Sequence, residues 1–349
     1  MWAERRDLRW SSGKSVRTPL LVPSFSSRGF GRVRNEPVES EVSQHLDYFL
    51  DQLSTVLVSA YDLHHGLLAA GKRVEEDWAT SSLEQPDVVV LDSGGYETAS
   101  GTDEGELIRD LRVTRDWEPP HWQQTLGWFG PACDNVVAVS FDRPGSPYVE
   151  QIERAQQELA PHGHLAPLML LKPERIRGVH RFAELEAQVE RLRFFSAVGV
   201  TEHELGGPLQ ARVEGVIELR EMLSRHSMQL PIHIFGALDP LFVPLYFAAG
   251  ADIFDGLTWL RYGFDHGLAV HRESAALLSG LLEERDDVRS RTVQTSNLGE
   301  LSALTRRLQR FAVEGQDWSL FDHPDVRARS RSLGETLENV FLSAKAGRS

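Results

Sequence analysis

The sequence IHIFGALDPLFVPLYFAAGADIFDG, from Ile232 to Gly256, contains two short apolar runs with a longer apolar segment between them. The runs Ile232–Ala237 and Ala251–Gly256 have the length and residue types of buried strands, whereas Pro240–Ala249 has helical periodicity. Two parallel strands joined by a helix form the basic unit of a parallel sheet. This stretch therefore predicts an α/β fold.

The same pattern of apolar run, polar loop and helical segment occurs along most of the chain. Six further strands are expected at Val16–Pro23, Thr55–Tyr61, Asp87–Gly95, Asn135–Asp142, His164–Lys172 and Ala197–Glu202. Further helices are expected at Ser40–Leu53, Tyr148–Leu159, Glu174–Phe194, Leu209–Ser224, Ser274–Glu284, Leu298–Val313 and Leu333–Ala344. The strands are apolar throughout instead of alternating, which is typical of strands covered on both faces.

Eight strand-then-helix units predict a closed (β/α)8 TIM barrel, with an open doubly wound sheet as the alternative. No linker rich in Gly or Ser divides the chain. We therefore expect a single domain over residues 1–349. Its barrel core is expected at about 15–270, followed by a helical extension at about 271–349.

Composition limits the functional classes. The 349 residues include 41% hydrophobic residues and carry a net charge of −14, as expected for a globular protein. No signal-peptide or membrane-spanning run is present, which predicts a cytoplasmic protein without a membrane partner. A single cysteine, Cys133, excludes an internal disulfide and a thiolate-paired zinc site. A metal would have to be held by His and carboxylates, and no HExxH-like spacing appears, so we expect no metal and no cofactor.

The acidic net charge argues weakly against indiscriminate binding of polyanions, although local charge differs from the total. Arginines cluster in the sequence at Arg5, Arg6, Arg9, Arg28, Arg32, Arg34, Arg306, Arg307, Arg310, Arg327, Arg329 and Arg331. Such clusters are typical either of a solvated face or of a surface that follows phosphates.

Three of the expected strands end in an acidic residue: Asp92, Asp142 and Asp255. Active sites of such barrels lie at the carboxyl ends of the strands, so these side chains should meet at one mouth. Each aspartate alone could instead serve a turn or a helix cap. Two carboxyl groups at one site can divide the work of nucleophile and proton carrier, as substitution at a sugar anomeric carbon requires.

Two aromatic residues and a glycine pair accompany these acids. Gly94 and Gly95 allow the backbone to approach a ligand closely, although a tight turn would need them equally. Tyr96 and Phe235 could stack on a flat base at the same mouth. Packing within the loop and within the barrel core is the alternative role for these rings.

Several segments resemble the tRNA-guanine transglycosylases, TIM-barrel enzymes that exchange guanine in RNA for a 7-deazaguanine, and their DNA-modifying relatives. The segments are RTPLLVPSF (Arg17–Phe25), VLDSGGYE (Val90–Glu97), SFDRPGSPY (Ser140–Tyr148), ELGG (Glu204–Gly207), FGALDPLFVPLYFAAGADIFDGLTWLR (Phe235–Arg261) and, more weakly, NLGELSALTRRLQRF (Asn297–Phe311). The likeness covers most of the chain.

The resemblance implies a role for each acid. Asp255 matches the nucleophile that captures C1′ of the ribose, Asp92 the carboxyl group that transfers protons, and Asp142 the residue that accepts hydrogen bonds from guanine. The resemblance also implies further substrate-binding positions, which are Ser93, Gly94, Tyr96, Gly206, Gly207, Phe235, Gly236 and Arg261, and Lys172 is a further candidate although it departs from the family pattern.

The chain departs from the family pattern at several positions. His271–Ser296, where the family has a cysteine-rich zinc site, contains no cysteine, so zinc is not expected there. Lys172 stands near the family's glutamine, where it could hold a base carbonyl or a phosphate, or could pair with a neighbouring acid. Glu97 and Ser59 replace Gln and Asn of the bacterial enzymes. These departures leave substrate specificity and oligomeric state open.

The leading prediction is therefore exchange of guanine in nucleic acid, with tRNA favoured, for a 7-deazaguanine base through a covalent aspartyl-glycosyl intermediate. The same exchange on DNA is one alternative. A non-catalytic subunit paired with an active paralogue is a second, and a hydrolase acting on a free nucleoside is a third. A homodimer or a heterodimer with a paralogue is compatible with the sequence.

Overall fold

The computed structural model describes residues 2–30, 41–68, 86–98, 115–265, 267–281 and 283–321. The chain divides into two compact units. The first comprises Met1–Leu238 and Leu245–Leu257, and the second comprises Asp239–Pro244 and Thr258–Ser349. The expected single domain, with a helical extension from about residue 271, stays a prediction.

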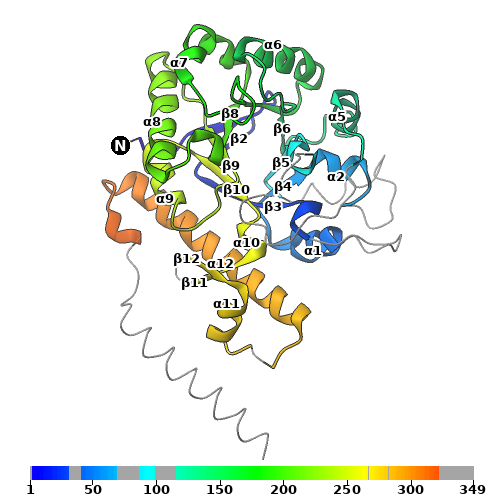
Figure 1. Ribbon diagram of the computed structural model, residues 1–349, viewed down its shortest axis with the longest axis vertical. Helices are drawn as coiled ribbons and strands as arrows, with labels where there is room; N and C mark the ends of the chain where they lie inside the picture. Colours follow the sequence, from blue (N-terminus) through cyan, green and yellow to red (C-terminus); the bar gives the residue numbers. More distant parts are fainter. Residues whose placement is uncertain are drawn as a thin grey trace, which may run out of the picture. The chain divides into compact units, whose positions relative to one another are not determined.

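The first unit contains a closed barrel of eight parallel strands, as predicted (Figure 1). The strands are β3 (Leu20–Phe25), β4 (Thr55–Ser59), β5 (Val88–Asp92), β6 (Val136–Val139), β7 (Ala166–Leu170), β8 (Ala197–Thr201), β9 (Ile232–Phe235) and β10 (Ile253–Gly256). Each strand pairs with the next in sequence, and β10 pairs with β3 to close the barrel. The (β/α)8 fold class is therefore confirmed.

All eight barrel strands are shorter than expected, and the first one is also displaced along the sequence. Val16 does not belong to the barrel but to β2 (Ser15–Arg17), which forms an antiparallel hairpin with β1 (Asp7–Arg9). The barrel strand begins only at Leu20. The sequence suggested one longer strand because the apolar residues before and after Thr18 and Pro19 lie close together in the sequence. In the structure these two residues separate segments that belong to different sheets.

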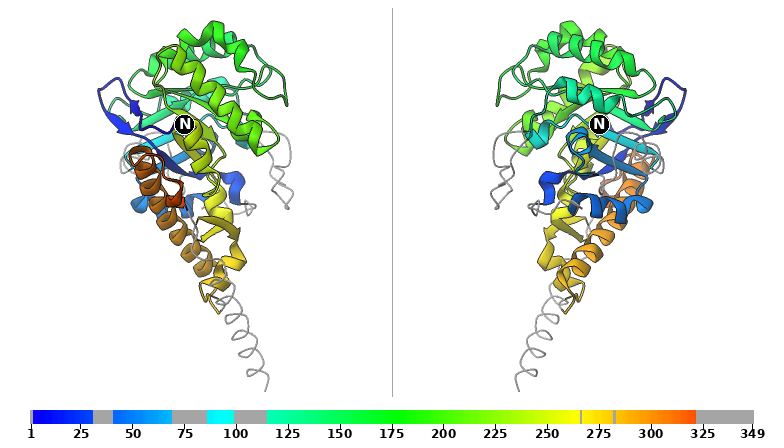
Figure 2. Two further views of the ribbon diagram at one scale, coloured as in Figure 1. Left: turned by 90° about the vertical axis from the view of Figure 1, so that its left-hand side faces the viewer. Right: turned by 90° about the vertical axis from the view of Figure 1, so that its right-hand side faces the viewer.

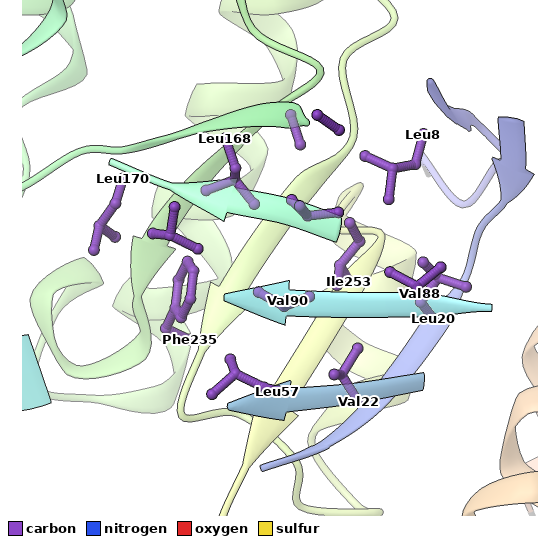
Figure 3. Packing of buried hydrophobic residues seen from close by; sticks show 14 of the residues in the cluster. Leu8, Leu20, Val22, Leu57, Val88, Val90, Leu168, Leu170, Phe235 and Ile253 are labelled. Atoms are coloured by element: carbon purple, nitrogen blue, oxygen red, sulfur yellow. The ribbon is translucent and has the colours of Figure 1, made fainter. Parts of the chain in front are cut away.

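The barrel interior is filled by apolar side chains from the strands and from this hairpin. In Figure 3 the arrowheads of the strands point towards Phe235 and away from Leu8. Leu8 is fully buried, and the buried Trp10 donates a hydrogen bond from Nε1 to the carbonyl oxygen of Val136 at 2.8 Å. The hairpin therefore packs against the amino-terminal end of the barrel interior.

Helices surround the strands of this unit (Figure 2). They are α1 (Glu41–Phe49), α2 (Ala60–His64), α4 (Gly95–Thr98), α5 (Pro119–Leu126), α6 (Tyr148–Leu159), α7 (Phe182–Leu185), α8 (Leu209–Arg225) and α9 (Val243–Ala249), whose first two residues belong to the second unit. Short 3-10 helices are η1 (Ser27–Phe30), η2 (Leu50–Gln52), η3 (Ala160–His162), η4 (Glu186–Phe194) and η5 (Glu202–Leu205). The barrel strands are buried along nearly their whole length, which agrees with the apolar pattern of their sequences.

The expected helix Glu174–Phe194 was wrong in its first half. Turns occupy the segment before α7, where Arg177 adopts a positive φ of 59° and Gly178 follows. The segment after α7 is the 3-10 helix η4 instead of an α-helix. Helical periodicity alone did not reveal these breaks.

The second unit contains α10 (Thr258–Arg261), a hairpin of β11 (Tyr262–Asp265) and β12 (Leu268–His271), α11 (Arg272–Leu278), α12 (Asp286–Val313) and η6 (Trp318–Phe321). Asn297 of α12 links these elements. Its Nδ2 donates to the carbonyl oxygens of Trp259 and Tyr262 at 2.6 and 2.8 Å, and its Oδ1 accepts from the N–H of Phe264 at 2.6 Å.

Helix α12 begins twelve residues before the expected Leu298, because its polar first turns carry little apolar periodicity. The expected helix Leu333–Ala344 and the arginines Arg32, Arg34, Arg327, Arg329 and Arg331 lie outside the described residues. Among the helices of the described part of the chain, none is both long and apolar enough to span a membrane.

Candidate active site

Two of the three singled-out aspartates lie at the carboxyl ends of barrel strands and the third lies just beyond one. Asp92 is the last residue of β5, Asp255 is the third of four residues in β10, and Asp142 is the third residue after the end of β6. This end of the barrel is where the active sites of such folds lie.

Asp255 is almost fully buried and accepts three hydrogen bonds. Oδ2 accepts from the Ser24 hydroxyl at 2.8 Å, while Oδ1 interacts with His233 Nε2 at 3.0 Å and with the Gly236 N–H at 3.3 Å. Ser24 belongs to β3 and His233 to β9, which are the two strands that flank β10. Donors from both flanking strands therefore converge on this one carboxyl group.

Asp92 has acidic neighbours, whereas Asp255 has several hydrogen-bond donors. Burial is the main reason that the pKa of this carboxyl group lies well above its ordinary value, and the charges of Glu97, Asp142 and Asp255 raise it further. The Gly94 N–H, 3.1 Å from Oδ2, offsets only part of this effect. The acids thus lie within electrostatic reach of one another, and Asp92 favours the protonated form.

Glu97 occupies a buried pocket beside Asp92. Its two carboxylate oxygens accept hydrogen bonds from the hydroxyls of Ser26 and Ser59, the latter at 2.8 Å. Ser59 is also the residue of β4 paired with Asp92 in the parallel ladder. The two departures from the family pattern at Glu97 and Ser59 are therefore contacting residues, which spacing in the sequence could not show.

Asp142 lies against the DSGGY segment. It accepts a hydrogen bond from the Ser93 hydroxyl, and Gly95 approaches so closely that a Cβ there would overlap the carboxyl group. Gly94 adopts a positive φ of 89°, and a Cβ at this position would collide with Trp117 and Tyr61. Both glycines are thus required by close approach, and Gly94 by its conformation as well.

Lys172 lies between two acids, which agrees with the alternative that it pairs with a neighbouring acid. Its Nζ lies 2.9 Å from Glu204 Oε1 and 3.6 Å from Asp142 Oδ2, and it donates to the Thr201 hydroxyl at 3.1 Å. Burial alone would lower the pKa of Lys172, but the charges of Asp142 and Glu204 raise it above its ordinary value. The lysine therefore stays charged at neutral pH.

The glycine pair Gly206–Gly207 follows η5 and is held by Arg212. The guanidinium donates to the carbonyl oxygens of Gly206 and Gly207, each at 3.0 Å, and to Glu202 at 3.1 Å. Gly206 has a φ of 155°. This loop follows Glu204, the partner of Lys172, so it borders the same group of charged residues.

The two expected stacking residues have different surroundings. The Arg28 guanidinium lies 4.5 Å from the centre of the partly exposed Tyr96 ring. Phe235 is 8% exposed, belongs to the barrel interior and stacks on His233 with 3.9 Å between ring centres. Arg261 ends α10 in the second unit. The base-stacking roles of the rings and the binding role of Arg261 stay predictions.

Sequence reasoning missed three residues of this site, which are Ser24, His233 and Glu204. His233 precedes Phe235 by two positions, so both side chains of β9 point to the same side, and this alternation was a usable signal. Ser24 and Asp255 lie 231 positions apart in the chain, and no local pattern connects them.

The other end of the barrel also carries buried charges, but these hold the fold together. Asp252 is fully buried and binds the guanidinium groups of Arg6 at 3.0 Å and Arg220 at 2.7 Å. A cleft of about 1040 Å³ at this end is lined by residues that precede β7, β8 and β9, among them Leu165 and Ser196. Residues at the amino-terminal end of such barrels serve stability.

Within the described residues, no three His, Cys, Asp or Glu side chains form a group that could hold a metal ion. The zinc site of the resembled family needs thiolates. Cys133, the single cysteine of the sequence, is buried in the first unit. The chain therefore lacks the donor set of such a site.

Comparison with known proteins identifies a relative of this chain. The chain is similar to a tRNA-guanine(15) transglycosylase of Aeropyrum pernix, with 27% identity over 72% of this chain. The match covers 53% of the relative, so the chain corresponds to about half the length of that protein. No protein-family model matches the sequence.

Proposed function

We propose that this protein exchanges guanine in nucleic acid for a free purine-like base, through a covalent bond between Asp255 and the sugar. The observation that carries the proposal is the contrast between two neighbouring acids. Asp255 is surrounded by hydrogen-bond donors, whereas burial and three acidic neighbours raise the pKa of Asp92 well above its ordinary value. A carboxylate nucleophile beside a carboxyl group with a raised pKa is the pair of groups that glycosyl transfer requires.

The first half of the reaction releases the original base. An oxygen of Asp255 forms a bond to C1′, and the bond from C1′ to N9 of guanine breaks with its electron pair going to the base. Asp92 supplies the proton that neutralises the departing base. The products are a glycosyl ester on Asp255 and an ionised Asp92.

The second half reverses these roles. Asp92 accepts the N9 proton of the incoming base, N9 forms a bond to C1′, and the ester bond to Asp255 breaks with its electron pair returning to the carboxylate. Asp92 is then protonated again. Atoms and charges balance without a cofactor, because one glycosidic bond replaces another.

Recognition of guanine is assigned to Asp142. Guanine presents N1–H and N2–H donors, and an ionised carboxylate accepts both. Lys172 holds a positive charge 3.6 Å from Asp142 Oδ2, and a base that lacks the two donors would leave this carboxyl group unpaired. The 7-deazaguanine class of incoming base follows from the resemblance to the transglycosylases.

We favour tRNA over DNA as the polymer. The relative from Aeropyrum pernix is named a tRNA-guanine(15) transglycosylase, which supports RNA. The target nucleotide must leave its stack before a buried carboxylate can reach C1′, and unpaired loops of RNA meet that requirement at the least cost.

Incorporation of labelled guanine tests the proposal. The purified protein is incubated with radiolabelled guanine and either transcribed tRNA or duplex DNA, and label in the polymer is counted. We expect incorporation into tRNA, a covalent adduct on denaturing gels, and loss of both in Asp255→Asn. Label in DNA alone would reverse the choice of polymer, and label in neither would refute the proposal.

A further inference from the structure

The two oxygens of Asp255 are not equivalent. Oδ1 lies 3.0 Å from His233 Nε2 and accepts from the Gly236 N–H at 3.3 Å, whereas Oδ2 accepts from the Ser24 hydroxyl at 2.8 Å. A carboxylate oxygen has two lone pairs. Within the described residues, both lone pairs of Oδ1 are used and one lone pair of Oδ2 is not.

His233 is held in a single orientation. The side chain is fully buried, its ring stacks on Phe235 at 3.9 Å, and its backbone lies between Gly199 of β8 and Ile253 of β10 in the ladder. Neither neighbouring strand position contributes a polar side chain. Packing therefore restricts the imidazole to the position facing Asp255.

The imidazole makes one polar contact. Its Nδ1 is buried and has no hydrogen-bond partner among the described residues, so the contact of Nε2 with Asp255 is the only hydrogen bond of the ring among these residues. Because a carboxylate only accepts, Nε2 must carry the proton. A buried nitrogen without a partner costs stability, and an apolar side chain of similar size would avoid that cost. The hydrogen bond to Asp255 is therefore the interaction that a histidine provides at this position and an apolar side chain would not.

We infer that His233 is a positioning residue that makes Oδ2 the attacking oxygen of Asp255 and stabilises the carboxylate when it is released. This inference rests on the proposed function. In the first half-reaction the free lone pair of Oδ2 forms the bond to C1′, while the electron pair of the C1′–N9 bond goes to the base. Oδ1 then becomes the carbonyl oxygen of the ester and keeps its two donors.

The strength of these hydrogen bonds changes during the reaction. Oδ1 shares the negative charge of the free carboxylate, but it is neutral in the ester, and bonds to charged acceptors are the stronger ones. The His233 N–H therefore stabilises the free carboxylate more than the ester. When the incoming base breaks the C1′–Oδ2 bond, charge returns to Oδ1 and this donor assists the step.

Removal of the donor should therefore enrich the covalent adduct. In His233→Leu, the ratio of adduct to free enzyme in the presence of tRNA and guanine should rise about tenfold or more, the range of one charge-assisted hydrogen bond. Discharge of the adduct by a chase of unlabelled guanine should slow to a similar extent. His233→Gln supplies an amide N–H in place of the imidazole donor and should restore both quantities to near wild type.

Three measurements distinguish this role from a structural one. Thr55→Val, which removes a buried hydrogen bond to Leu21 elsewhere in the barrel, should leave the adduct ratio unchanged. Thermal unfolding reports whether each variant folds, and His233→Met provides a second variant without a donor if the leucine variant does not. A merely structural His233 would lower adduct and turnover together, in the glutamine variant as well.

The outcomes separate the inference from the proposed function. Wild-type protein that forms no adduct and exchanges no guanine refutes both. Wild-type activity with an unchanged or lower adduct ratio in folded His233→Leu or His233→Met overturns the role of His233 alone. Wild-type activity with adduct enrichment that glutamine reverses supports it.

Discussion

Replacement of Gly95 by alanine is expected to weaken guanine recognition while leaving the fold intact. A Cβ on this first residue of α4 would stand 2.8 Å from Asp142 Oδ1 and nearer still to Cγ and Oδ2. Ordinary contacts need about 3.4 Å or more, so the carboxyl group must retreat by roughly 1 Å. That movement strains its hydrogen bond from Ser93 and its approach to Lys172.

The magnitude follows from the displacement. A misplacement of about 1 Å at a reacting site costs up to roughly 100-fold in rate or binding. We therefore expect the KM for guanine to rise about 10- to 100-fold, which corresponds to about 1.4–2.7 kcal/mol. The value of kcat should change less, because the three atoms nearest to the new methyl group all belong to Asp142.

The assay is initial-rate incorporation of labelled guanine at saturating tRNA over a range of guanine concentrations. The φ of Gly95 lies outside the left-handed region, so alanine adopts it without strain, and the melting temperature should stay within about 4 °C of wild type. Gly130→Ala is the matched control, because a Cβ there meets no atom within 4 Å. A folded Gly95→Ala variant with an unchanged KM would refute the assignment of Asp142 to the base.

Three further predictions concern charge. The folded-state pKa of Asp92 lies above its ordinary value of 3.8, so the folded protein retains a proton that the unfolded chain loses, and the free energy of unfolding falls as pH rises from about 4 towards the raised pKa. Urea unfolding at several pH values should show a smaller decline in Asp92→Asn than in wild type, and equal declines would contradict a raised pKa of Asp92. Lys172→Met leaves Asp142 and Glu204 without their shared cation, and the KM for guanine should rise about tenfold in the incorporation assay, whereas an unchanged KM would mean that the lysine does not support Asp142. Asp252→Ala leaves the buried Arg220 guanidinium without its ion pair and leaves Arg6 paired only with the exposed Glu4, and it should lower the free energy of unfolding by about 3–5 kcal/mol in urea titrations. A loss below about 1 kcal/mol would show that the cluster does not stabilise the barrel.

The barrel was predictable because its strands are buried on both faces. Continuous apolar runs such as Val88–Leu91 are unusual outside parallel sheets, and eight of them in series leave few other topologies. The β1–β2 hairpin was not predictable in the same way. In the sequence, Leu8 and Trp10 are isolated apolar residues in a polar segment. Only the structure shows that both are buried in the apolar core at the end of the barrel.

The sequence by itself determined where the acids would lie, because a residue at the end of a parallel strand has its position set by the fold class. Only the tertiary structure decided which groups surround each acid. Ionisation depends on donors, burial and charges that are near in space, and Ser24, His233 and Glu97 reach Asp255 and Asp92 from separate strands and a helix. The apolar pattern along the sequence carries no information about which residues of different strands come into contact.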